Sequence, residues 1–441
     1  MKTECVTRTG AQVNARKTYQ TIDGWGLNIN SKDWAGGRLA PVVASFVDDL
    51  GVTLFRQDMF GRSDWIDPDG SRGAQSLDPA SLAEVYAGKD FANGAGMAKW
   101  FNTHGIEPYL AVSGHVPKWM CAADGRTLKD LKSWAEMVAS FAEWARKRAG
   151  IRFQLLGPMN ETDIGPPEGP AVNAPTCAKA CSVLLDALDR RGLRDIRLLV
   201  AEAAGHDPAF LKAFLRDRRL MCRVAAFGMH TYGDNPTGAA VDLVRRSTGW
   251  KDVPVWMTEY GDLDQTGERE WAVAWTIYRR LLRLLDEGYS AAFNWDAYDN
   301  WHDHDESWSI YGLVRRGIRE DTPKKRYWAC RQMYRFVRPG WARIETGCEA
   351  DGIALMAFLS PDGTQITVTG MNDTGRDVSL NVMIEGVDLK AMAPRAAIYR
   401  TTAVENCARL GAVPLRTSSW PLWGIEIPAS ADSIFTATTL G

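Results

Sequence analysis

The chain has 441 residues, of which 45% are hydrophobic and 24% are charged, as is usual for a globular protein. This length exceeds a typical single domain, so we expect either one large barrel with an addition or two to three smaller domains. The formal net charge of −2 gives no basic footprint for nucleic acid or for an anionic membrane surface, and no apolar run reaches the roughly 18 residues of a membrane span.

The start of the chain and its cysteines bear on location and on metals. Residues 1–7 lack the apolar core of a signal peptide, which predicts either a secreted or periplasmic protein whose signal has been removed or a cytoplasmic one. The eight cysteines form no C-x-x-C pair, so neither a zinc ribbon nor a thioredoxin-like site is predicted. The 18 tryptophans are as compatible with core filling as with stacking on the apolar faces of sugar rings.

Eight short apolar segments rich in β-forming residues follow one another along the first three quarters of the chain. They span residues 22–29, 53–59, 107–114, 152–159, 196–202, 225–232, 255–260 and 290–297. Such runs are typical of parallel strands that are buried on both faces.

Amphipathic segments lie between these strands. In residues 131–148 one helical stripe holds Leu131, Trp134, Val138, Phe141, Trp144 and Ala145. Residues 178–191 and 270–286 show the same repeat and are followed by glycines that end a helix. Eight strands, each followed by a helix, predict a (β/α)₈ TIM barrel over residues 22–337. The main alternative, a doubly wound sheet, lacks the expected G-x-G-x-x-G after its first strand.

The pattern changes after residue 340. Residues 353–359, 365–369, 378–384 and 396–400 alternate between apolar and polar and are separated by turn sequences. They predict an antiparallel β-sandwich domain over residues 338–441, so the whole chain is predicted to be an α/β barrel with an appended β-sandwich. Residues 1–21 are also β-like, and we expect them to complete this second domain, which would then be a packed accessory rather than an independent binding module.

Two glutamates fall where a TIM barrel carries its chemistry, at the C-terminal ends of the strands. Glu161 follows the fourth strand directly after Asn160, and Glu259 ends the seventh strand. Barrel closure brings these two ends to one cavity, where one carboxyl can protonate a glycosidic oxygen and the other can attack the anomeric carbon or activate water. A single Glu at a strand end is more often a surface or salt-bridged residue, but two on these strands favour sugar cleavage.

This pair resembles the signature of clan A glycoside hydrolases, in which the strand-four Glu is the acid/base and the strand-seven Glu is the nucleophile. The resemblance implies substrate-binding or tuning roles for further residues, namely Arg56, Asn160, His230, Tyr232 and Trp295. It also implies a carbohydrate substrate and retention of anomeric configuration, which requires carboxyls about 5–5.5 Å apart.

Within the clan, the sequence is most similar to glycoside hydrolase family 30, with families 5 and 39 as alternatives. Residues 20–26 (Q-T-I-D-G-W-G) resemble that family's opening Q-x-I-x-G-F-G, and residues 334–340 (Y-R-F-V-R-P-G) resemble its S-x-F-I-R-P-G link into the β-sandwich. Residues 112–120 resemble its strand-three S-x-P-x-W-M segment. Trp25, where Phe is usual, and His115 depart from the family pattern and concern the substrate rather than the mechanism.

Residues 296–308 form an eighth loop that is dense in His, carboxylates and aromatics. We interpret it mainly as a polar wall of the sugar site, with Trp301 and Trp308 stacking on sugar; a structural hydrogen-bond network and a metal site at His302 and His304 are the alternatives. His115 and Trp119, after strand three, are further candidate sugar contacts.

Three more expectations complete the sequence-based prediction. Glu202, which ends strand five, is interpreted as a partner for an Arg or His beside the site. We expect no cofactor and no metal, and the sequence carries no signal for an oligomeric state. Two other functions stay open: a barrel that binds glycans without cutting them, and a metal-dependent hydrolase that uses the eighth loop.

Overall fold

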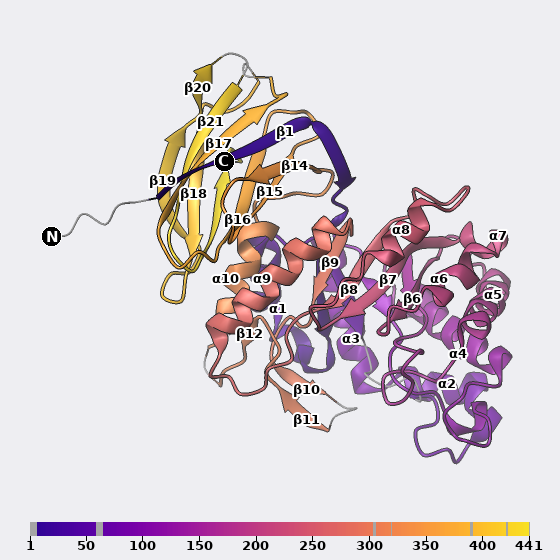
Figure 1. The fold of residues 1–441 in the computed structure, drawn as a ribbon. Helices are drawn as coiled ribbons and strands as arrows, with labels where there is room; N and C mark the ends of the chain where they lie inside the picture. The colour runs from indigo at the N-terminus through magenta and orange to yellow at the C-terminus, as the bar shows by residue number, and fades with distance from the viewer. Residues whose placement is uncertain are drawn as a thin grey trace.

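The computed structural model describes residues 7–58, 65–302, 306–318, 320–388, 391–419 and 422–440. Figure 1 shows two bodies side by side, a barrel ringed by helices and a layered β-domain that contains both the first strand and the C-terminal strands. The predicted fold class, a TIM barrel with an appended antiparallel β-domain, is confirmed. No described helix is long and apolar enough to cross a membrane.

The barrel consists of eight parallel strands that close on themselves. In barrel order they are β2 (Gly24–Asn30), β3 (Leu54–Asp58), β4 (Tyr109–Ala111), β5 (Leu155–Gly157), β6 (Arg197–Ala203), β7 (Val224–Thr231), β8 (Val255–Tyr260) and β9 (Ala291–Asn294). Nearly every residue of these strands is buried, because side chains fill the barrel on one face and meet the helices on the other. Each strand lies within or next to the segment predicted for it, and β8 has the predicted bounds.

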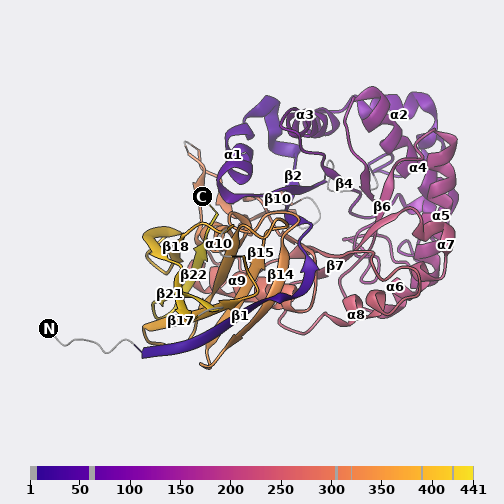
Figure 2. The same cartoon turned by 90° about the horizontal axis from the view of Figure 1, so that it is seen from above.

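The helices form the outer layer, and Figure 2 shows them around the barrel strands. They are α1 (Ala40–Ser45), α2 (Pro79–Tyr86), α3 (Lys89–Thr103), α4 (Leu131–Glu143), α5 (Ala174–Arg190), α6 (Pro208–Leu215), α7 (Arg218–Met221), α8 (Ala239–Arg245), α9 (Glu270–Asp286) and α10 (Lys325–Tyr334). Short 3₁₀ or π turns are η1 (Lys32–Gly37), η2 (Phe46–Leu50), η3 (Gly73–Leu77), η4 (Lys118–Met120) and η5 (Trp144–Arg148). Helix α4 begins where the Asp130 side chain accepts from the Ser133 amide, and α5 begins at the equivalent cap of Asn173.

Two small hairpins lie between β9 and α10. The first pairs β10 (Asn300–His302) with β11 (Ser307–Ser309), and the second pairs β12 (Val314–Arg315) with β13 (Thr322–Pro323). In the first hairpin Trp301 lies directly opposite Trp308. Because side chains alternate along a strand, these two tryptophans share one face while their neighbours point to the other.

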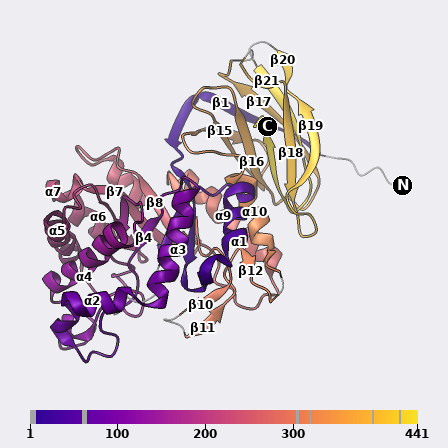
Figure 3. The ribbon, with the colours of Figure 1, turned by 180° about the vertical axis from the view of Figure 1, so that it is seen from behind.

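The β-domain is one sheet of ten strands that folds over itself around a second apolar core. Its order is β19 (Ala408–Pro414), β18 (Arg395–Thr401), β22 (Ser433–Thr438), β16 (Ile366–Asn372), β15 (Ile353–Leu359), β14 (Ala342–Cys348), β1 (Thr7–Thr21), β17 (Val378–Glu385), β21 (Leu422–Ala429) and β20 (Arg416–Ser419). Strand β1 lies inside the sheet, antiparallel to β14 and parallel to β17. Figure 3 shows it crossing the domain before the chain enters the barrel. The domain boundary near residue 338 stays a prediction.

The β-domain packs on α9 and α10 through apolar and hydroxyl contacts. Met356, Phe358 and Met371 of the β-domain belong to the same buried cluster as the barrel helices. The Tyr278 hydroxyl of α9 is hydrogen-bonded to the Thr369 hydroxyl of β16. This shared core holds the two bodies together, as expected of a packed accessory domain.

Candidate active site

A cavity opens at the C-terminal ends of the barrel strands. The residues that line it are Asn28, Ile29, Asn30, Arg56, Asp58, Ser113, Gly114, Asn160, Glu161, Pro167, Glu168, Tyr232, Glu259, Leu263, Trp295, Asp296, Asn300, His302 and Tyr311. They come from the ends of most barrel strands and from the loops that follow, which is where barrel enzymes place their reacting groups.

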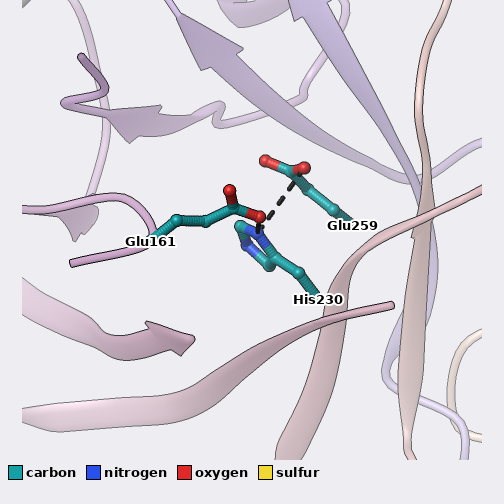
Figure 4. Close-up of side chains that lie close together, drawn as sticks. All are labelled: Glu161, His230 and Glu259. Carbon is teal, nitrogen blue, oxygen red and sulfur yellow. Dashed lines mark hydrogen bonds and ion pairs between the residues drawn. The ribbon is translucent and has the colours of Figure 1, made fainter. Parts of the chain in front are cut away.

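Glu161 and Glu259 face each other across this cavity with His230 between them (Figure 4). One oxygen of each carboxylate and one nitrogen of the imidazole all lie within 4.8 Å of one another. His230 Nδ1 is 2.7 Å from Glu161 Oε1 and 3.5 Å from Glu259 Oε2. The pairing of β7 with β8 sets His230 beside Glu259, and all three side chains are almost fully buried.

Arg56, on β3, connects the two halves of the site through its guanidinium. One terminal nitrogen donates to Glu259 Oε1 at 2.6 Å and to Asn28 Oδ1 at 2.9 Å. The other terminal nitrogen donates to Asn160 Oδ1 at 2.6 Å. The planar guanidinium therefore fixes the Glu259 carboxylate and the residue before Glu161 with one rigid group.

Both oxygens of Glu259 accept hydrogen bonds. The second donor is the hydroxyl of Tyr232, 2.5 Å from Glu259 Oε2. Burial, together with the carboxylates of Glu259 and Glu161, raises the pKa of Tyr232 well above its usual value, so the phenol stays protonated and donates. Burial also raises the pKa of Glu259, but the positive charges of His230 and Arg56 oppose that rise. A carboxyl that accepts at both oxygens has the hydrogen-bond pattern of the ionised form.

His230 is a cation in this setting. Burial alone would lower the pKa of its imidazole, but the carboxylates of Glu259, Glu161 and Glu202 outweigh burial and raise the pKa to about 10. Its Nε2 lies 3.7 Å from Glu202 Oε1, on the side away from Glu161. As an imidazolium it donates Nδ1–H to Glu161 and keeps positive charge between the two cavity carboxyls.

The backbone carries positive φ angles next to these groups. Glu161 has φ 42°, Ala201 has φ 73° and Glu202 has φ 43°, in the region that residues with a Cβ rarely adopt. The Glu161 amide donates to the Glu202 carbonyl at 3.0 Å, which joins the two unusual segments. Such conformations cost free energy and are found mainly at functional sites, where surrounding contacts hold them.

The eighth loop supplies one wall of the cavity. Trp295 lines it, and its ring meets that of His302 edge to face at 5.3 Å. Asp296 accepts from the side-chain Nδ2 of Asn300 at 2.7 Å and lies 3.3 Å from His302 Nε2. This hydrogen-bonded wall agrees with the interpretation of the loop as a polar side of the cavity, although its tryptophans are placed differently.

Four residues predicted as sugar contacts lie outside the lining of this cavity. His115 turns to the following loop, where its Nε2 is 2.8 Å from the Gly125 carbonyl oxygen, and Trp119 packs against the main core. Trp301 and Trp308 stand on the outer face of their hairpin, 47% and 46% exposed, while Asn300 and His302 take the inner face. The remaining predicted residues, Arg56, Asn160, Glu161, Tyr232, Glu259 and Trp295, line the cavity, and His230 lies directly beneath it.

Some lining residues were not predicted as sugar contacts, notably Asn28, Ser113, Glu168 and Tyr311. Asn28 had a usable signal, since a polar residue near the end of a buried barrel strand points at the cavity. Glu168 and Tyr311 come from loops, whose path the sequence pattern does not predict.

By geometry, the cluster of Glu161, His230 and Glu259 is also the one group among the described residues that offers three possible metal ligands close together. However, Nδ1, the imidazole nitrogen nearest both carboxylates, is the Glu161 hydrogen-bond donor when His230 is charged, and a charged imidazole cannot bind a metal. Of the loop proposed as an alternative metal site, His302 faces Asp296. His304 lies outside the described residues.

Comparison with known proteins identifies this arrangement. A family model described as the glycosyl hydrolase catalytic core matches residues 125–306, a segment that includes Glu161, His230 and Glu259. This segment of the chain is thus similar to a glycosyl hydrolase catalytic core. The prediction that it is a glycosidase is thereby confirmed.

Solved structures resemble the hydrolase over nearly its whole length. A glycoside hydrolase family 30 subfamily 8 xylanase from Clostridium acetobutylicum is 16% identical with a TM-score of 0.70, and a family 30 endoxylanase from Clostridium papyrosolvens is 17% identical with a TM-score of 0.72; each match covers 97% of this chain and 99% of the other. An endo-β1,6-glucanase is 16% identical with a TM-score of 0.68, covering 99% of this chain and 96% of the other. These likenesses show a shared fold.

Proposed function

We propose that the hydrolase cleaves a β-linked oligo- or polysaccharide by double displacement, with retention of anomeric configuration. The observation that carries this proposal is the closeness of Glu161 and Glu259, whose nearest oxygens lie within 4.8 Å. Retaining enzymes hold their two carboxyls about 5–5.5 Å apart, whereas inverting enzymes leave about 6.5–9.5 Å for a water molecule. The short distance between these oxygens therefore supports the retaining arrangement.

In the first step Glu259 attacks the anomeric carbon while Glu161 gives its proton to the leaving oxygen. Glu259 suits the nucleophile because Arg56 and Tyr232 both donate to it and favour its ionised form. The bond from the anomeric carbon to the leaving oxygen breaks, and a glycosyl ester of Glu259 forms. The leaving group departs as an alcohol with the proton of Glu161.

In the second step Glu161, now ionised, takes a proton from water, and the water oxygen attacks the anomeric carbon. The ester bond to Glu259 breaks, and Glu161 regains its proton. Asn160 and Trp295 are proposed to hold the sugar, since both line the cavity, and Arg56 holds Asn160 in place.

Trp301 and Trp308 are proposed to contact substrate outside the cavity. They form a cross-strand pair of half-exposed rings on the outer face of the hairpin that carries Asn300 and His302 on its cavity side. Paired indole rings present a flat apolar surface of the kind on which sugar rings stack. His115 and Trp119 contact other parts of the protein, and a sugar contact of either residue stays a prediction.

The proposed substrates are polymers of the kind named in the related structures, xylan and β1,6-glucan. Such polymers occur outside the cell, so a secreted or periplasmic location is part of the proposal. Arg56, Tyr232 and the two carboxyls act on any β-linked ring, whereas the loops around the cavity select the sugar.

The experiment that tests the mechanism compares Glu161→Ala and Glu259→Ala on aryl β-glycosides and defined oligosaccharides. The cleavage rate of Glu161→Ala should fall about 10²–10⁴-fold on substrates with poor leaving groups and stay near the wild-type rate on dinitrophenyl glycosides. Added azide should rescue this variant and give the β-glycosyl azide as product. Glu259→Ala should be inactive on all of them without added azide, and with azide it should convert the dinitrophenyl glycoside to the α-glycosyl azide.

Proton NMR of the first-formed product should show the β anomer. The exposed Glu84→Gln, on α2, serves as the matched control and should retain wild-type rates. A first-formed α anomer would refute retention. Binding of oligosaccharide without any turnover would favour a glycan-binding barrel, and loss of activity on chelation would favour a metal-dependent hydrolase.

A further inference from the structure

A third carboxyl, that of Glu202, lies under the active site without lining the cavity. It belongs to β6 and is 1% exposed. Neither of its oxygens has a hydrogen-bond partner among the described residues. Its Oε1 instead lies 3.4 Å from Arg56 Nε and 3.7 Å from His230 Nε2. A buried carboxylate with so little hydrogen bonding is costly, so its presence requires a reason.

The surrounding strands are built to leave room for this side chain. A Cβ added at Gly157 on β5 would lie 2.7 Å from Glu202 Oε2, and one added at Gly228 on β7 would lie 2.9 Å from its Cγ. The residue itself and Ala201 hold positive φ angles. Small neighbours on both sides and an uncommon backbone together place a negative charge at this point.

Its position completes a compact cluster of charges. The charged and titratable groups that face one another here are Arg56 on β3, Tyr109 on β4, Glu161 after β5, Glu202 on β6, His230 and Tyr232 at the end of β7, and Glu259 on β8. The two tyrosines stay neutral, since burial raises the pKa of both well above the usual value. Among the described residues, the side chains of Asp163 and His206 form their hydrogen bonds with backbone atoms.

A count of charges shows what Glu202 contributes. Arg56 adds one positive charge, and the ionised Glu259 and Glu202 add one negative charge each. The Glu161–His230 pair is then favoured in its form with two protons, an imidazolium beside a carboxylic acid, because that form makes the buried cluster neutral. Without the charge of Glu202, neutrality would instead favour a pair with one proton, for which His230 and Glu161 would compete.

We propose that Glu202 is a positioning residue whose buried negative charge keeps His230 protonated, so that His230 does not take the catalytic proton from Glu161. This inference rests on the proposed role of Glu161 as the acid. Glu202 touches neither substrate nor the reacting atoms, and it acts through His230, whose Nδ1 is 2.7 Å from Glu161. The Glu161 amide, which donates to the Glu202 carbonyl, ties the two residues together mechanically as well.

The test is the pH profile of kcat/KM for Glu202→Gln on two substrates, an unsubstituted oligosaccharide and a dinitrophenyl glycoside. In the wild type the basic limb for the oligosaccharide reports loss of the acid proton. Removing a negative charge makes that proton easier to lose, so the limb should move to lower pH by about one to two units. At pH 7 the oligosaccharide should lose at least about tenfold more activity than the dinitrophenyl glycoside, which needs no proton on its leaving oxygen.

Two variants separate charge from packing. Glu202→Asp keeps the charge and should restore the position of the basic limb, even if it lowers the rate. Tyr109→Phe removes a neighbouring hydroxyl without changing charge and should leave the limb in place. A Glu202→Gln enzyme with an unmoved limb and equal losses on both substrates would overturn the proposal, because a purely structural role predicts that result.

A measurement on the wild type tests the proposal even if Glu202→Gln does not fold. Nitrogen-15 NMR of labelled histidine, with His230 assigned by its loss in His230→Gln, should show both ring nitrogens protonated throughout the active pH range. A neutral His230 in that range would overturn the proposal. The failure of the mechanism itself is distinct, since Glu161→Ala would then show no difference between good and poor leaving groups.

Discussion

Replacement of Arg56 by lysine tests how much the site depends on the shape of a cation rather than on its charge. The guanidinium donates to Glu259, Asn28 and Asn160 at 2.6, 2.9 and 2.6 Å and pairs with Glu202 at 3.4 Å. An ammonium keeps the charge but cannot reach these partners at once from one side chain.

Loss of two hydrogen bonds donated by the charged guanidinium costs about 3 kcal/mol. If that loss falls on the transition state, kcat/KM of Arg56→Lys should drop about a hundredfold.

The assay is kcat/KM on a dinitrophenyl glycoside, where Glu161 is not needed and the rate reports on Glu259. Thermal unfolding is followed in parallel, because a poorly paired Glu202 should also lower the melting temperature. Arg219→Lys, which changes an exposed pair with Asp186, is the matched control and should alter neither quantity. If Arg56→Lys keeps its activity within about threefold, the reasoning that a rigid fork orients Glu259 is refuted.

Two further predictions concern the eighth loop. Trp308→Ala should leave kcat/KM on a small aryl glycoside unchanged and lower kcat/KM on the polymer about tenfold, as expected for a lost stacking contact outside the cavity. If the variant keeps the wild-type kcat/KM on both substrates, that contact is excluded. Lys324→Met breaks a buried pair with Asp299 at 2.7 Å and leaves an unpaired charge, so the free energy of unfolding in urea should fall by about 3–5 kcal/mol. The exposed Lys147→Met is its control, and a fall below about 1 kcal/mol would show that Asp299 is readily neutralised or hydrated.

The barrel could be predicted from the sequence because its pattern is local. The segment 255–260 is an apolar run whose bounds match β8, since every one of its residues is buried. The prediction 107–114 was too long, because the apolar run continues after the paired residues of β4 end at Ala111. The positions of Glu161 and Glu259 followed from the same pattern, because barrel closure converts strand ends into one cavity.

Features that depend on loop path or long-range pairing were not predictable in this way. The outward direction of Trp301 and Trp308 follows from the register of a hairpin whose strands are only three residues long. His115 departs from the cavity because the loop after β4 turns it toward Gly125. The parallel pairing of β1 with β17 joins residues more than 350 positions apart, and no short-range pattern encodes it.

The place of β1 in the middle of the β-domain has a consequence for biosynthesis. Its two neighbours, β14 and β17, are translated only after the entire barrel, so β1 must wait for residues 342–385 before its ladder can form. Meanwhile β1 exposes two unpaired edges. A chain released before residue 342 would therefore keep β1 unpaired, with both edges open to pairing with other chains or to binding by chaperones.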